Sequence, residues 1–144
     1  MNISTIKKVL EKGDHEEKLD LLSNLYCLFD SDENYSSTYT EVVNELIAYA
    51  ISELDVELKE KAFSTLAAAV SKLNIEQVDV TKLIDNLSNL SNEHLHTAID
   101  VISSTHNKEH IPLLASYRHH SDNTVAFSAG VGLRTIHNGP KRPN

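Results

Sequence analysis

Hydrophobic residues recur along almost the whole chain at intervals of three and four positions, which places them on one face of an α-helix. This pattern predicts eight helices, with apolar positions in the ranges 3–10, 19–29, 42–50, 58–73, 80–87, 95–102, 111–117 and 125–136. Strand signals are nearly absent, because no run of alternating β-branched and polar residues extends over five positions. The sequence therefore predicts an all-α protein.

Small polar residues, glycine and proline mark the ends of these helices. Gly13 is predicted to end the first helix and Asp14 to cap the second. Pro112 falls in the first turn of the seventh helix, where proline is tolerated. We expect a single helical-repeat domain over residues 1–137, followed by a flexible C-terminal tail over residues 138–144.

The helices repeat in pairs along the chain. A shift of 41 residues lays Ile6 on Ile47, a shift of 37 lays Leu46 on Leu83, and a shift of 30 lays Leu83 on Leu113. The repeating unit is a helix, a turn with a capping residue and a second helix, and about four such units fill the chain. Because the three shifts are unequal, an irregular α-helical bundle is the alternative architecture.

The second helix of each unit resembles that of the HEAT-repeat family, in which Asp, Val, a basic residue, Ala and Leu follow one another at helical spacing. The last unit keeps this pattern except at its basic position, with Asp122, Val125, Ala126, Ala129 and Leu133. An earlier unit keeps the basic residue, with Asp55, Leu58, Lys59, Ala62 and Leu66, and the third unit has Asn92, Leu95 and His96. The resemblance extends over residues 1–137 and implies stacked antiparallel helix pairs, a short α-solenoid whose concave face binds proteins.

Negative charge is concentrated in the first part of the chain. Residues 1–60 carry five lysines and fourteen Asp and Glu, a net charge of −9, whereas residues 61–144 carry eight Lys and Arg and seven acids, a net charge of +1. An acidic surface repels nucleic acid and attracts a basic protein. If the helix pairs stack, carboxylates of two neighbouring turns come together as a candidate partner-binding patch: Asp14, Glu17, Asp20, Glu53, Glu57 and Glu60. The alternative is that this acidity serves only solubility.

One segment has the ligand spacing of an EF-hand calcium loop. Oxygen-bearing side chains fall at its ligand positions, namely Asp30, Asp32, Asn34, Ser36, Thr38 and Glu41. Tyr35 stands where the loop needs glycine, and Ser37 stands where an apolar residue normally pairs with a second loop. We therefore interpret residues 30–41 as a polar loop between repeats, with a calcium-binding loop as the alternative. The histidines complete no zinc set, so neither a metal nor a cofactor is expected.

Catalytic and membrane motifs are not found. The sequence has no nucleophile elbow, no phosphate-binding loop and no convincing Cys–His pair, so we expect no enzyme. It has no apolar run near the ~20 residues that span a bilayer and no signal-peptide core, which favours a cytoplasmic location and no membrane partner. Cys27 lies among apolar residues and is predicted to be buried. Gly130 and Gly132 predict close packing of the last helix.

The size, acidity and helical architecture resemble those of bacterial immunity proteins, including those of contact-dependent growth inhibition systems. This resemblance implies a chain that is monomeric when free and neutralises a basic, nuclease-type toxin by covering its active site. The alternatives are a HEAT-type adaptor or complex subunit and, with less support, a calcium-binding helical protein. A HEAT-like DNA glycosylase is disfavoured, because the chain has no Trp and one acidic half.

Overall fold

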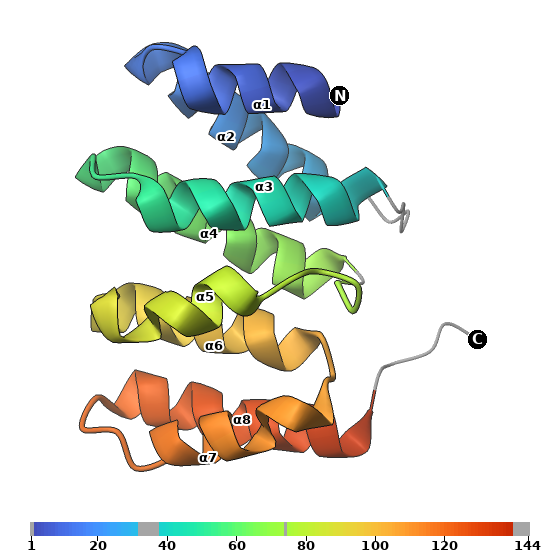
Figure 1. Cartoon of the computed structure of the whole chain (residues 1–144), viewed down its shortest axis with the longest axis vertical. Coiled ribbons are helices and arrows are strands. Elements are labelled where there is room, and N and C mark those ends of the chain that lie inside the picture. The colour runs from blue at the N-terminus through green and yellow to red at the C-terminus, as the bar shows by residue number, and fades with distance from the viewer. Residues whose placement is uncertain (1, 32–37, 74, 140–144) are drawn as a thin grey trace. The chain divides into compact units, whose positions relative to one another are not determined.

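The computed structural model describes residues 2–31, 38–73 and 75–139 (Figure 1). Within these ranges the chain forms α-helices and short 3-10 helices and no strand, so the predicted all-α class is confirmed. Tertiary contacts divide the chain into two compact units, Met1–Asn74 and Ile75–Asn144. The single domain over residues 1–137 stays a prediction. The last helix includes Asn138, the first residue of the predicted tail, and residues 140–144 lie outside the described ranges.

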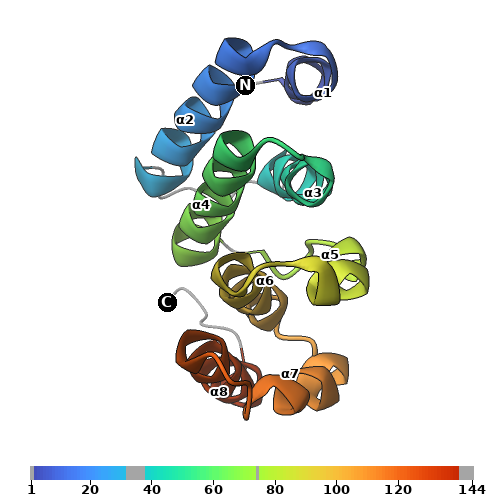
Figure 2. The same cartoon turned by 90° about the vertical axis from the view of Figure 1, so that its left-hand side faces the viewer.

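The first unit consists of two helix pairs. Helices α1 (Ile3–Lys12) and α2 (His15–Ser31) form the first pair, and α3 (Thr38–Ser52) and α4 (Val56–Lys72) form the second. The second helices of the two pairs, α2 and α4, share the most extensive contact of this unit, and α1 lies beside α3. Figure 2 shows α2 and α4 together in one layer of this unit, with α1 and α3 in the other.

The second unit is built in a similar way but has shorter first helices. Helix α5 (Thr81–Asn86) continues as the 3-10 helix η1 (Leu87–Asn89) and precedes α6 (Asn92–Ser104). The 3-10 helix η2 (Lys108–His110) leads into α7 (Ile111–Tyr117), which precedes α8 (Asn123–Asn138). Helix α8 packs against both α6 and α7. The predicted fifth helix over 80–87 is therefore shorter than expected. Its N-cap residue, Val80, makes no side-chain cap, but the Asp79 carboxylate accepts a hydrogen bond from the Thr81 N–H (3.0 Å).

Side-chain caps set the beginnings of the longer helices, as the sequence predicts. Asp14 accepts a hydrogen bond from the Glu17 N–H (2.9 Å), and the Glu17 carboxylate accepts one from the Asp14 N–H (3.3 Å), which makes a capping box. At Asp55 and Asp122 the carboxylate accepts the N–H three residues later, at 3.0 Å in both cases. The caps at Asp14 and Asp55 fix the turns that carry the exposed acidic residues of the first unit.

Helix α2 shows how the helical period divides apolar residues between the core and the surface. Leu22, Leu25 and Phe29 are buried inside the unit, where α2 packs against α4 and the Phe29 ring meets Tyr39 of α3. Cys27 is exposed, so the prediction that it is buried is wrong. At 100° per residue Cys27 lies about 140° around the helix from Leu22, and therefore on the outer face. Tyr26, beside it, is also exposed and lies under the Lys61 ammonium, 5.1 Å from its ring centre.

Lys59 on α4 binds the C-terminal end of α3. Its ammonium donates hydrogen bonds to the carbonyls of Ala50 (2.8 Å), Ile51 (3.1 Å) and Glu53 (3.3 Å). These carbonyls have no partner inside the helix, and the positive charge matches the negative end of its dipole. Burial lowers the pKa of Lys59 from its ordinary value. The basic position of the HEAT-like pattern thus has a structural role here.

Replacing Lys59 with methionine is expected to lower the free energy of unfolding by about 1–3 kcal/mol, because three carbonyls lose their charged donor while the aliphatic packing is kept. The measurement is urea unfolding followed by circular dichroism. The matched control is Lys8→Met on the exposed face of α1, which should change stability by no more than about 0.5 kcal/mol. Equal effects of the two substitutions would contradict a capping role for Lys59.

Candidate functional site

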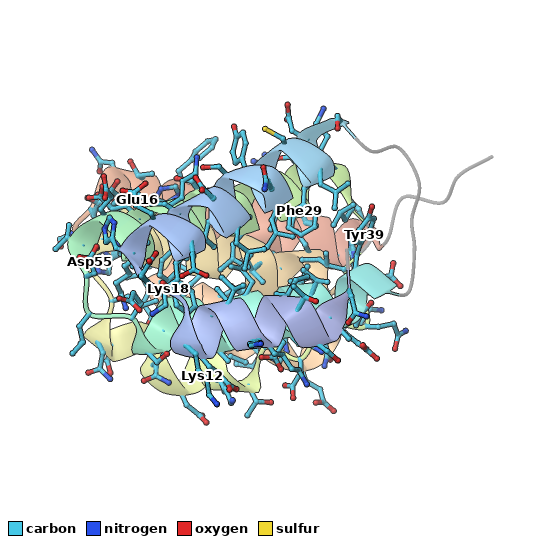
Figure 3. All side chains as sticks on the ribbon, turned by 90° about the horizontal axis from the view of Figure 1, so that it is seen from above. Lys12, Glu16, Lys18, Phe29, Tyr39 and Asp55 are labelled. Carbon is cyan, nitrogen blue, oxygen red and sulfur yellow. The ribbon has the colours of Figure 1, made fainter. Side chains whose placement is uncertain are left out.

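The first turns of α2 and α4 lie together at one end of the first unit. His15 Nε2 is 3.0 Å from a Glu57 carboxylate oxygen and 3.6 Å from Asp55 Oδ1. Figure 3 shows Glu16 and Asp55 at this same end. The contacts of His15 therefore join the α1–α2 turn to the α3–α4 turn, and bring together the two groups of carboxylates named from the sequence.

The predicted partner-binding carboxylates are almost all available to solvent. Asp14, Glu17, Asp20, Glu57 and Glu60 are exposed, and only Glu53 is half-buried. None of them forms an ion pair with a lysine or arginine among the residues that the structure describes. This end of the first unit therefore keeps a net negative charge.

Two lysines of the first unit are engaged within it. Lys59 is directed at the carbonyls of α3, and the Lys18 ammonium lies over the Tyr49 ring, 5.7 Å from its centre. Tyr49 is buried, and burial raises the pKa of its hydroxyl, with a further rise from the negative charge of Glu53. The phenol consequently stays neutral and adds no charge to this end.

Two large aliphatic side chains project from the α3–α4 turn among these carboxylates. Leu54 is 93% exposed and Val56 is 71% exposed, the highest values for large hydrophobic residues in the described ranges. Between them Asp55 has an extended backbone (φ −69°, ψ 125°), and its carboxylate is turned back to cap α4. In an extended segment, the side chains before and after a residue point away from the side chain of that residue. Because the Asp55 carboxylate is turned toward α4, the side chains of Leu54 and Val56 face solvent.

Sequence reasoning missed this apolar pair, although a local signal exists. An apolar residue just before a helix cap usually packs against the fourth residue of the helix. At α4 that position is Lys59, whose ammonium is directed at α3, so Leu54 lacks an apolar partner there. We call the following residues the acidic surface: the carboxylates Asp14, Glu17, Asp20, Glu53, Glu57 and Glu60, together with Leu54 and Val56.

A groove of about 570 Å³ lies between α7 and α8 in the second unit. Its lining is apolar and cationic, and includes Ile111, Phe127, Val131, Leu133, Arg118 and Arg134. Phe127 is 69% exposed. Gly130 contributes no side chain, and an added Cβ there would meet nothing within 4 Å. This α7–α8 groove was not expected from the sequence, because the same residues fit the apolar spacing of an ordinary packed helix.

Asp100 is the carboxylate of α6 that is most affected by its surroundings. It is half-buried, and this burial raises its pKa above the ordinary value. His96, 3.9 Å away, and the hydroxyl of Ser128, which donates a hydrogen bond to it, partly offset this rise. Since Ser128 belongs to α8, the hydrogen bond joins α6 to α8 inside the second unit.

The candidate calcium loop falls largely outside the described residues. Asp32, Asn34 and Ser36 lie in the range 32–37, and the side chain of Thr38 is not described either. Asp30, near the end of α2, and Glu41, in the first turn of α3, are both exposed. Among the described residues no three His, Cys, Asp or Glu side chains are grouped so that they could hold a metal ion. The interpretation of this loop stays a prediction.

No helix in the described ranges combines the length and the apolar character that crossing a membrane requires. A comparison of the chain with protein-family models, with curated proteins and with solved structures finds no match.

Proposed function

We propose that this chain is a protein-binding module that takes up a basic partner on the acidic surface. The observation that carries the proposal is the exposure of Leu54 and Val56 among carboxylates that form no ion pair with a lysine or arginine of the described residues. Large exposed aliphatic side chains within a charged rim are typical of protein interfaces. Neither side chain contributes much to the core, so the folded unit gains little from keeping them apolar.

The two kinds of side chain have different roles in this proposal. The carboxylates attract a basic partner over about 8–10 Å and mainly raise the association rate. Leu54 and Val56 then lose their contact with water, and burial of such side chains contributes about 1.5–3 kcal/mol each. Their effect is mainly on the dissociation rate.

Within this class we propose an immunity protein that covers the active site of a basic, nuclease-type toxin. The concentration of negative charge in residues 1–60 supports this, because a nuclease site that binds phosphate is positively charged. A HEAT-type adaptor is the alternative. The packing of α2 along α4 and of α6 along α8 supports HEAT-like repeats within each unit.

Reversing the charge of Asp20, Glu57 and Glu60 together to lysine is expected to slow association with the partner at least about tenfold at low salt, and to flatten its salt dependence. Folding should be retained, because all three side chains are exposed. The matched control reverses Asp85, Glu93 and Glu109, which are exposed carboxylates of the second unit. Both variants change the net charge equally, so a difference between them reports the position of the charge.

The partner is first captured from cells with the wild-type chain and, in parallel, with the two triple variants as bait. A basic protein retained by the wild-type chain is then used to measure the association rates of all three chains at low and high salt. Equal rates and equal salt slopes for all three chains would exclude the acidic surface as the interface. Expression of the captured protein with and without this chain then separates an immunity protein, which restores growth, from an adaptor.

A further inference from the structure

The α7–α8 groove has the chemistry of an unoccupied docking surface. Phe127 and Ile111 expose apolar area at a groove whose cations are Arg118 and Arg134, and among the described residues no acidic side chain lines it. Neither arginine forms an ion pair within the part of the chain that the structure describes. The groove therefore suits a segment that brings apolar side chains flanked by negative charge.

The C-terminal residues 140–144 do not have this character. Their sequence is Pro-Lys-Arg-Pro-Asn, with two cations, no carboxylate side chain and no large aliphatic residue. Two guanidinium groups at the groove would repel them. Charge complementarity therefore favours a different occupant.

The α3–α4 turn of the same chain carries the required chemistry. Leu54 and Val56 project into solvent, and Glu53, Asp55 and Glu57 surround them with negative charge. We propose that this turn from a second copy of the chain docks in the α7–α8 groove. In the contact, the two aliphatic side chains meet Phe127 and its apolar neighbours while the carboxylates meet the arginines.

Such a contact joins two different surfaces, so it is head-to-tail rather than two-fold symmetric. Each molecule has one turn and one groove, and association can therefore continue from copy to copy. This differs from the monomer that the resemblance to immunity proteins implies. The inference goes beyond the proposed function but uses part of the same acidic surface. A basic partner bound there consequently competes with self-association.

Sedimentation velocity of the purified full chain, from low to high micromolar concentration, tests the inference. The weight-average mass is expected to rise with concentration at low salt, and to rise less at high salt because the charges are screened. A mass that stays at that of the single chain, 16.0 kDa, over the whole range would overturn the proposal.

Two single variants identify the surfaces. Leu54→Asp removes an apolar side chain of the turn, and Phe127→Asp places a negative charge in the apolar part of the groove. Each alone is expected to weaken association at least about tenfold, since each breaks one half of every contact. An equimolar mixture of the two variants should form a dimer and nothing larger. The Leu54→Asp chain keeps an intact groove and the Phe127→Asp chain keeps an intact turn, so only one contact can form. Self-association of either single variant as strong as that of the wild-type chain would contradict the assignment of the turn and the groove as the two contact surfaces. A mixture of the two variants that stays monomeric would also contradict it.

A charge exchange provides a second readout that does not depend on apolar substitutions. Arg134→Glu is expected to weaken self-association about tenfold or more, and addition of Glu57→Arg in the same chain should restore part of it. Circular dichroism and the thermal midpoint control for folding in every variant. No recovery in the exchanged chain would exclude this pairing. Phe127→Asp leaves the acidic surface intact, so loss of self-association and loss of binding to the basic partner are distinguishable.

Discussion

Replacing Ile99 with alanine is expected to lower the free energy of unfolding by about 2–5 kcal/mol. Ile99 lies in the middle of α6, and none of its surface is exposed. Helix α6 packs closely against α8, so the neighbours of Ile99 cannot collapse fully into the space that the shorter side chain leaves. The same range is expected for Leu66→Ala in α4 and Leu114→Ala in α7, which are also fully buried.

Urea unfolding followed by circular dichroism measures these three costs. The sequence places all three residues at the apolar centre of their helices, and their burial confirms that placement. Leu54→Ala is the control, since it removes as many atoms as the leucine substitutions from a side chain that is 93% exposed. Its effect should be within about 0.5 kcal/mol. Near-neutral effects at Leu66, Ile99 and Leu114 would mean that their helix faces are assigned wrongly.

Replacing Gly132 with alanine is expected to destabilise the protein by about 1–3 kcal/mol, although alanine is the better helix former by about 1 kcal/mol. A Cβ at Gly132 would overlap the Ser103 hydroxyl and lie 3.0 Å from the Ser103 Cβ. Ser103 is buried, and its hydroxyl donates a hydrogen bond to the Ile99 carbonyl (2.7 Å). The obstacle therefore belongs to the α6 face that α8 packs against, and it cannot move without losing that bond.

Gly130→Ala is the matched control in the same helix. Nothing lies within 4 Å of an added Cβ at Gly130, so the helix-propensity gain should appear as about 0.5–1 kcal/mol of added stability. Thermal and urea unfolding of the two variants should thus give opposite signs. A Ser103→Gly substitution should recover part of the loss in the Gly132→Ala chain. Destabilisation by both glycine substitutions would point to backbone requirements of α8 rather than to the contact with Ser103.

These two glycines also show how far the sequence predicts helix packing. A stretch rich in small residues predicts that the last helix approaches a neighbour closely, and Gly132 confirms this prediction. At Gly130 the prediction is wrong, because this residue opens into the α7–α8 groove. The two positions are two residues apart and so lie about 160° from each other around the helix, and only one of them can face α6.

The sequence predicted the carboxylates of the acidic surface but not its exposed apolar residues, Leu54 and Val56. Carboxylates at the two turns follow from the caps and from the charge count, which depend on residues close together in the sequence. The proximity of His15 to Glu57 requires α2 to pack along α4. The exposure of Leu54 depends on the direction that Lys59 takes toward α3. Neither fact is contained in the local pattern.

The sequence by itself determined the all-α class, the caps at Asp14, Asp55 and Asp122, and the concentration of negative charge in residues 1–60. These properties arise from interactions within about one helical turn, where spacing and hydrogen-bonding capacity decide the outcome. Only the tertiary structure decided that Cys27 and Phe127 face solvent and that the α7–α8 groove is cationic. A helix has more apolar residues than one neighbour can cover, so helices distant in the sequence decide which of those residues are buried.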